Sequence, residues 1–181
     1  MAFLACASAR SQPAQYQIDP EHTFVTFEIV HFGTSTNRGR FDRSSGSVQL
    51  DRDAKAGSVD VSIDMASINT GTQAFDGLLR GFQFFDVATF PTARFVADDL
   101  SFHEKALDEV SGMLTLRGRT HQVVLKAKQF NCYIEGESKR EVCGGDFETV
   151  IDRSDWGVNY GIIFGFPKSV HLIVQVEARE K

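Results

Sequence analysis

The sequence predicts an all-β protein folded as one eight-stranded antiparallel barrel. About eight stretches of the chain alternate apolar and polar residues, which is the pattern of a strand with one buried face. Short turns separate these stretches, so consecutive strands are expected to run antiparallel, and closure into an up-and-down barrel removes the exposed edges. Sixteen of the 181 residues are Phe, against three Tyr and one Trp. Because Phe carries no polar group, this bias favours a large dry interior.

The first strands are expected to bend. Residues 16–20 are interpreted as a short lead-in, and residues 23–32 as a strand with apolar side chains on both faces at its ends. Residues 36–50 predict a second strand that contains Gly39 and Gly46. Glycines within long strands mark the bends and bulges that a closing barrel needs.

The remaining elements follow the same alternation. Residues 58–65 alternate without interruption, which predicts a half-buried strand with its polar face in water. Residues 74–80 favour one or two helical turns. The hairpin of residues 109–117 and 121–130 has the strongest signal. Further strands are predicted at residues 92–103, 145–152 and 169–178, and a second apolar loop at residues 162–167.

Residues 75–95 form the most unusual stretch, with six phenylalanines and no single periodicity. Gly and Pro interrupt it, and surface loops are normally polar, so the segment is expected to cover something apolar. Two interpretations stay open: a lid that completes an ordinary core, and a lid over an apolar ligand cavity. In the second, Phe82, Phe84, Phe85 and Phe90 line or close the lumen and contact the chain of the ligand.

Length and charge limit the class of function. The chain has no linker or internal repeat and suits one domain, assigned to residues 16–181. The formal net charge of −5 and the pI near 5.5 argue against a nucleic-acid or anionic-membrane partner, since both need basic patches. Residues 1–15 are expected to be a signal remnant or a disordered tail, because Ala5-Cys6-Ala7 matches the small-x-small end of a secretory signal.

The three cysteines suggest an exported protein. Cys132 and Cys143 bracket a polar loop, which predicts a disulfide worth about 3 kcal/mol on the loop-entropy model. Cys6 is then the odd thiol and would leave with the signal, although its retention in the mature protein stays open. Disulfide and signal both point to an oxidising compartment. A zinc pair is the alternative, but no second Cys or His pair has matching spacing.

No catalytic or metal motif is visible, so no catalytic residue and no metal ligand is assigned. None of the five histidines forms a pair with metal-ligand spacing, and the motif Gly-x-Ser-x-Gly is absent. A nucleophile–base pair assembled by the fold stays open. His31 suits either contact with a ligand headgroup or a bond to a neighbouring backbone group.

Polar residues among apolar ones are the better site candidates, since a pocket needs a few of them to orient its ligand. Arg153 and Asp155 suit this role, but they also suit a pair that fixes a turn. Trp156 suits stacking on a ligand or capping the barrel end. The other polar candidates are Asn37, Arg38, Arg40 and Asn159.

Several motifs together resemble the YceI-like family of bacterial proteins over residues 16–178. They are Tyr16-Gln-Ile-Asp-Pro-Glu-His, Val30-His-Phe-Gly, Arg38-Gly-Arg-Phe, Ile63-Asp-Met-Ala-Ser-Ile-Asn-Thr-Gly, Leu79-Arg-Gly-Phe-Gln-Phe-Phe-Asp-Val-Ala-Thr-Phe-Pro, Gly112-Met-Leu-Thr-Leu-Arg-Gly-Arg-Thr and Arg153-Ser-Asp-Trp-Gly. The chain departs from the family at Gln83, usually Asp, and at Phe90, usually Tyr. Both changes make the lid less polar and concern the headgroup preference, not the fold.

The resemblance implies a lipocalin-like barrel, periplasmic or secreted, that binds a long isoprenoid or similar amphiphilic lipid in its lumen. Ubiquinone-like and polyprenyl molecules are the family's usual ligands, and transport, storage or sequestration is the expected function. An enzyme acting on a lipophilic substrate and a secreted scavenger of lipophilic antibiotics are the alternatives.

On this basis the lipophilic small molecule is the main partner, and no cofactor other than this bound lipid is implied. A membrane b-type cytochrome is a candidate partner, and the oligomeric state, with a homodimer as one option, stays open. The expected ligand-binding residues are Phe27, Ile29, His31, Phe41, Phe75, Leu78, Leu79, Phe82, Phe84, Phe85, Phe90, Phe95, Trp156, Asn159 and Phe164.

Overall fold

Strand segments form one antiparallel sheet that closes on itself in the computed structural model, which describes residues 13–104 and 106–181. In chain order the strands are β1 (Ala14–Ile18), β2 (Phe24–His31), β3 (Ser35–Phe41), β4 (Ser44–Asp51), β5 (Ala56–Asp64), β6 (Ile68–Asn69), β7 (Thr92–His103), β8 (Ala106–Leu116), β9 (Arg119–Ile134), β10 (Glu141–Asp152) and β11 (Ser169–Glu180). One α-helix, α1 (Gln73–Arg80), and two short 3₁₀ helices, η1 (Met65–Ser67) and η2 (Ile162–Phe164), accompany them.

The eleven strand segments described make eight barrel strands, because three pairs of segments each act as one interrupted strand. β1 and β2 pair with successive parts of β11. In the next barrel strand, β3 pairs with β2, and β4 pairs with β1. In the one after it, β6 pairs with β3, and β5 pairs with β4. The other five strands run uninterrupted from β7 to β11, and the β11–β1 pairing closes the ring. The predicted eight-stranded antiparallel barrel is therefore confirmed.

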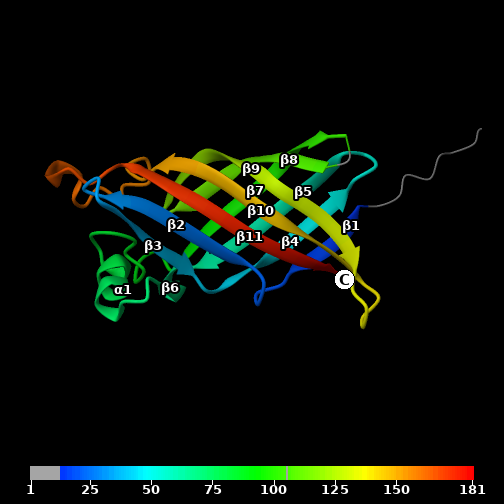
Figure 1. The fold of residues 1–181 in the computed structure, drawn as a ribbon, viewed down its shortest axis with the longest axis horizontal. Helices are drawn as coiled ribbons and strands as arrows, with labels where there is room; N and C mark the ends of the chain where they lie inside the picture. Colours follow the sequence, from blue (N-terminus) through cyan, green and yellow to red (C-terminus); the bar gives the residue numbers. More distant parts are fainter. Residues whose placement is uncertain (1–12, 105) are drawn as a thin grey trace, which may run out of the picture.

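The barrel has two different ends (Figure 1). At one end, α1, residues 81–91 and the β10–β11 connection at residues 153–168 lie across the strands; we call this the lid end. The β9–β10 hairpin and the end of β11 lie at the other, which we call the hairpin end. Since β6 is only two residues long, it pairs with only two residues of β3, Arg40 and Phe41, on that edge of the strand. The helix α1 follows at that point and places Leu79 in the core.

Two early elements differ from the prediction. The lead-in predicted at residues 16–20 is instead the second half of strand β1 and the turn after it, and β1 closes the barrel between β4 and β11. The strand predicted at residues 36–50 is interrupted at Asp42 and Arg43, where the chain passes from one pair of neighbours to another. Ser67 holds this corner, since its carbonyl accepts from the Asp42 amide and its hydroxyl accepts from the Arg43 amide.

The inward positions of the strands form the core as alternation predicts. Ile63, Phe95 and Leu114 face the interior and are all at most 8% exposed. The expected signal remnant and Cys6 lie outside the described residues, and β1 begins at Ala14, within the segment assigned to the tail. Within the described part of the chain, no helix is both long and apolar enough to cross a membrane.

Candidate functional site

The barrel interior contains two adjoining cavities. The upper cavity, of about 250 Å³, lies toward the lid end, and the lower cavity, of about 140 Å³, lies toward the hairpin end. Four aliphatic side chains belong to the walls of both, and we call them the waist: Val25, Ile63, Leu114 and Leu172. The lumen is thus a two-chambered space that runs along the barrel axis, with apolar walls on both sides of the waist.

The lower cavity ends at a tightly packed floor. Tyr16, 2% exposed, lines it and donates its hydroxyl proton to Glu141 at 2.5 Å. Burial first, and then this hydrogen bond, raise the pKa of Tyr16 above its ordinary value, so the phenol stays neutral. Arg52 donates to the other carboxylate oxygen of Glu141 and neutralises it.

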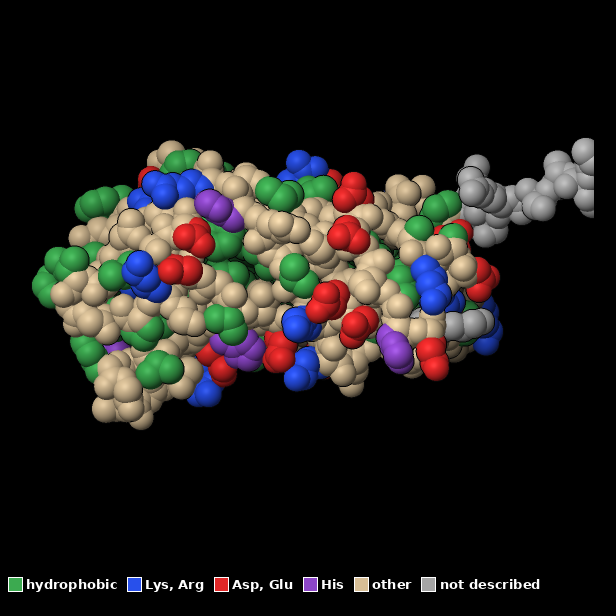
Figure 2. Space-filling view, turned by 90° about the horizontal axis from the view of Figure 1, so that it is seen from above, with side chains coloured by type: hydrophobic (Ala, Val, Ile, Leu, Met, Phe, Trp, Pro, Cys, Tyr) green, Lys and Arg blue, Asp and Glu red, His purple; other side chains and the backbone are tan. Residues whose placement is uncertain are grey.

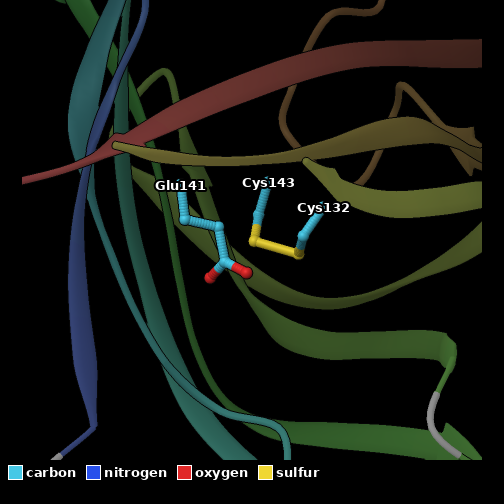
Figure 3. A group of neighbouring side chains, drawn as sticks. All are labelled: Cys132, Glu141 and Cys143. Carbon is cyan, nitrogen blue, oxygen red and sulfur yellow. A yellow bond between two sulfur atoms is a disulfide. The ribbon is translucent and has the colours of Figure 1, made fainter. Parts of the chain in front are cut away.

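The predicted disulfide is present at this floor. Cys132 and Cys143 face each other across the β9–β10 pair and are bonded, with Glu141 beside them (Figure 3). Because both sulfurs are in the disulfide, they are not thiolates that would bind zinc. Cys143 also lines the lower cavity, so the bond ties β9 and β10 together where the lumen ends.

Aromatic residues dominate the upper cavity. Phe27 and Phe41 enter from β2 and β3, and the ring of Phe85 meets Phe41 edge-on at 5.7 Å. Gly39, opposite Phe27 in the β2–β3 register, makes room for this arrangement, since a Cβ there would lie 2.5 Å from the Phe27 ring. Phe84 packs at 5.0 Å on Tyr160, which joins the two lid segments over the mouth.

Ten of the predicted ligand-binding residues line the lumen. Phe95 contributes to the lower cavity. The other nine line the upper cavity: Phe27, Ile29, His31, Phe41, Phe75, Leu78, Leu79, Phe84 and Phe85. Contact with a ligand remains a prediction for all ten. Phe84, Phe85 and Leu79 each belong to a core cluster and also line the upper cavity. These residues therefore fit both interpretations of the lid, as a cover that completes the core and as a cover over a cavity.

Three of the predicted residues lie outside the lumen and face solvent. Phe82 is 73% exposed and Phe164 is 67% exposed, and Asn159 is exposed as well. The tight turns at residues 81–86 reverse the chain within a few residues, so neighbouring phenylalanines point in different directions. Hydrophobic side chains consequently gather on the surface at the lid end (Figure 2).

The last two predicted residues pack outside the cavity walls. Trp156 is 2% exposed, and its indole N–H donates to the carbonyl of Leu114 at 3.0 Å, while its ring packs on His121. Trp156 therefore belongs to the core next to the barrel wall. Phe90 packs against the β8–β9 turn, where a Cβ on Gly118 would meet its ring at 2.8 Å.

Polar groups enter the lumen near its mouth. His31, Asn37, Arg153 and Tyr160 line the upper cavity, and the only polar side chains lining the lower one, among residues described, are Tyr16 and Thr23. The imidazole of His31 packs against the ring of Phe166 at 5.4 Å.

Arg153 does not form the expected pair with Asp155. Its Nε donates to the carbonyl of Pro167, and its Nη1 donates to those of Val158 and Tyr160. It therefore holds the β10–β11 connection over the cavity through backbone groups. Burial lowers the pKa of Arg153, which the charge of neighbouring Asp152 opposes.

Sequence reasoning did not select several lining residues. Phe166 lies in the apolar loop predicted at residues 162–167, and Tyr160 lies just before that loop. The prediction named only Phe164 in this region, and Phe164 faces outward. The aliphatic wall was visible as alternation along each strand, yet alternation gives the face of a residue and not its height in the barrel. Only the closed barrel shows that Val25, Ile63 and Leu172 lie at one level.

Comparison with known proteins agrees with the architecture. The sequence profile of the YceI-like domain matches residues 16–178. The protein YceI of Salmonella arizonae is 36% identical over 131 residues, which are 71% of this chain and 68% of that protein. The YceI protein of Campylobacter jejuni has a similar structure, with a TM-score of 0.72 at 26% identity over 84% of this chain and 90% of that chain.

A polyisoprenoid binding domain from Saccharophagus degradans also shares the fold. Its TM-score is 0.67 at 21% identity, and the match covers 92% of this chain and 98% of that chain. The profile match spans β1 to β11, the whole closed barrel with its lid. The chain therefore belongs to the YceI-like family.

Proposed function

We propose that the protein binds a long-chain isoprenoid or a similar amphiphilic lipid in the barrel lumen. The observation that carries this proposal is the pair of adjoining apolar cavities, together about 390 Å³; among the described residues that line them, charged side chains occur only near the mouth. Such a space suits a ligand with a long hydrocarbon chain and one polar end. Its volume falls within the usual range for ligand pockets, roughly 300–1,000 Å³.

The energetics support a chain-shaped ligand. Burying a few hundred Å² of alkyl surface is worth on the order of 10 kcal/mol gross at ~25 cal/mol per Å², less the cost of ordering a flexible chain. The similar domain of Saccharophagus degradans is described as polyisoprenoid binding, which supports the same class of ligand here. Quinone-like and polyprenyl lipids are the ligands to test first.

Binding is favoured over catalysis by the chemistry of the wall. Among the described residues that line the two cavities there is one histidine, His31, and no carboxylate. General acid–base catalysis needs a positioned group with a matching partner, and His31 packs between aromatic rings instead. Lipophilic antibiotics would enter the same lumen, so they belong in the same binding assay.

We place this function in the periplasm or outside the cell. The Cys132–Cys143 disulfide supports this, because such bonds persist in oxidising compartments. There the protein would transport, store or sequester a lipid that water does not dissolve. If the ligand is a quinone, a membrane b-type cytochrome is the partner with which it would exchange.

The test is native mass spectrometry of protein exported by a bacterial host, followed by organic extraction of any adduct. We expect a stoichiometric lipid with a long apolar chain, and the same spectrum reports the oligomeric state. Protein that emerges empty, and that also fails to bind added ubiquinone-8 and polyprenols, would refute the proposal.

Two lid variants show whether the adduct occupies the lumen. Phe85→Ala removes a ring that lines the upper cavity, whereas the matched control Phe82→Ala removes a ring that is 73% exposed. We expect lipid affinity to fall more than about tenfold in Phe85→Ala and to stay within about twofold in the control. Equal effects in the two variants would place the lipid elsewhere.

A further inference from the structure

Arg153 is an unusual residue for the wall of an apolar cavity. It is 6% exposed, and it lines the upper cavity from the β10–β11 connection. Arginine is rarely buried without a paired charge, since removing its cation from water is costly. Within the described chain, no carboxylate forms an ion pair with it.

The hydrogen bonds of Arg153 leave part of the guanidinium free. Nε donates to Pro167 at 2.9 Å, and Nη1 donates to Val158 at 2.6 Å and to Tyr160 at 2.9 Å, in each case to a backbone carbonyl. Nη2 donates to no atom of the residues that the structure describes, although Nη2 carries two protons. Neutral carbonyls satisfy three donors, but they leave the positive charge without a counter-ion.

The nearby acidic residue is already engaged elsewhere. The carboxylate of Asp152 accepts from the amide of Ser154 at 2.8 Å and from its hydroxyl at 2.5 Å. The amide and hydroxyl of Ser154 thus fix this carboxylate on the turn. Its charge stabilises the guanidinium at a distance without pairing with it. The lumen side of Arg153 therefore faces a cavity whose described lining holds no acidic group.

We propose that Arg153 is a headgroup-binding residue and that the lumen selects amphiphiles with an anionic headgroup, a carboxylate or a phosphate. This inference rests on the proposed function and narrows its ligand class. The hydrocarbon chain would lie along the two cavities, and the anion would accept from Nη2 at the mouth. Hydrogen bonds between a guanidinium and a carboxylate or phosphate are among the strongest in proteins, because both partners carry a full and opposite charge. Asn37 lines the same cavity and offers a neutral donor.

The experiment compares four probes with one C18 chain: oleate, oleyl phosphate, oleyl alcohol and oleylamine. Binding to the delipidated wild-type protein is measured by calorimetry. We expect at least one of the two anions to bind at least about tenfold more tightly than the alcohol, because a hydrogen bond to a charged group is worth that much. The amine should bind most weakly. The stronger anion identifies carboxylate or phosphate as the preferred headgroup.

The outcomes separate this inference from the proposed function. Equal affinity for the alcohol and both anions would overturn the role of Arg153 while leaving lipid binding intact. Failure of all four probes, and of the isoprenoids, would overturn both. Because the probes share one chain, differences among them report only the headgroup.

Three variants locate the preference. Arg153→Met should abolish the anion preference, and Arg153→Lys, which retains the charge, should keep most of it. Arg117→Met is the matched control, since Arg117 also binds two lid-end carbonyls, those of Gly157 and Phe82, but does not line the cavity. We expect this control to keep the full preference. A folded Arg153→Met protein that still prefers the anion would contradict the inference, and the wild-type probe series decides the matter if that variant does not fold.

Discussion

The waist offers a direct test of the two-chambered lumen. Leu172 lies on β11 in the walls of both cavities, so Leu172→Trp places a large ring where the two chambers meet. We expect the ring to close the passage, because the cavities on either side give it space without displacing packed neighbours. The lower cavity should then become unreachable from the lid end, while the upper cavity stays open.

The expected loss follows from the volume of the lower cavity. At roughly 30 Å³ for a group the size of a water molecule, about 140 Å³ holds four or five methylene-sized groups. At about 0.8 kcal/mol for each buried methylene, a blocked ligand forfeits about 3–4 kcal/mol gross. The chain segment excluded from the protein keeps its freedom, which returns part of this loss. A net loss of at least about tenfold in affinity remains for long ligands.

The assay is calorimetric binding of a series of primary alcohols of increasing chain length. Affinity for the wild type should rise with each methylene until both cavities are filled. In Leu172→Trp the rise should stop earlier, with short ligands unaffected. Val150→Trp is the matched control, because Val150 lies on the neighbouring strand but is 63% exposed. A common chain-length limit in all three proteins would refute the continuous lumen.

Three further outcomes follow from the structure. Replacing Cys132 and Cys143 with Ala should cost about 3 kcal/mol for a bridge of sequence separation 11, which urea unfolding would detect as a lower midpoint; an unmoved midpoint would contradict the loop-entropy account. The hydroxyl of Thr70 donates a hydrogen bond to the carboxylate of Asp76 and lowers the pKa of that carboxyl. This bond therefore stabilises the folded protein at pH values above the ordinary Asp pKa near 4. The contribution is lost as the pH falls through the lower pKa of the folded state. The drop in urea midpoint between about pH 7 and about pH 3 should be smaller in Asp76→Asn, and an equal drop would exclude this contribution. Trp156→Phe removes one donor from a buried β8 carbonyl and should cost about 1–3 kcal/mol of stability, whereas lipid affinity should stay unchanged; a loss of affinity would return Trp156 to the binding site.

Local pattern was sufficient for much of the architecture. Alternation from Val59 to Ile63 predicted strand β5 and its buried face, since successive side chains of a strand point to opposite sides. The apolar and polar sequence around Leu79 predicted α1 to within one residue at its start. The spacing of Cys132 and Cys143 predicted their bond, because an antiparallel hairpin brings such positions face to face.

The interruptions of the strands were not visible in the sequence. The corner at Asp42 and Arg43 exists because the chain changes neighbours there, and the bonds that hold it come from residue 67, far along the chain. The sequence predicts a lead-in instead of strand β1 for a similar reason. Its partners, β4 and β11, come from distant parts of the sequence, and only closure of the barrel brings them together.

The sequence by itself determined that this is a β-barrel with an apolar interior and an aromatic lid, because period, glycine placement and composition are local properties. Only the tertiary structure decided which aromatic side chains face the lumen. Phe84 and Phe85 line the upper cavity while Phe82 faces solvent, since tight turns without a repeating period set each direction separately. The position of Arg153 on the cavity wall likewise depends on carbonyls that the folded β10–β11 connection supplies.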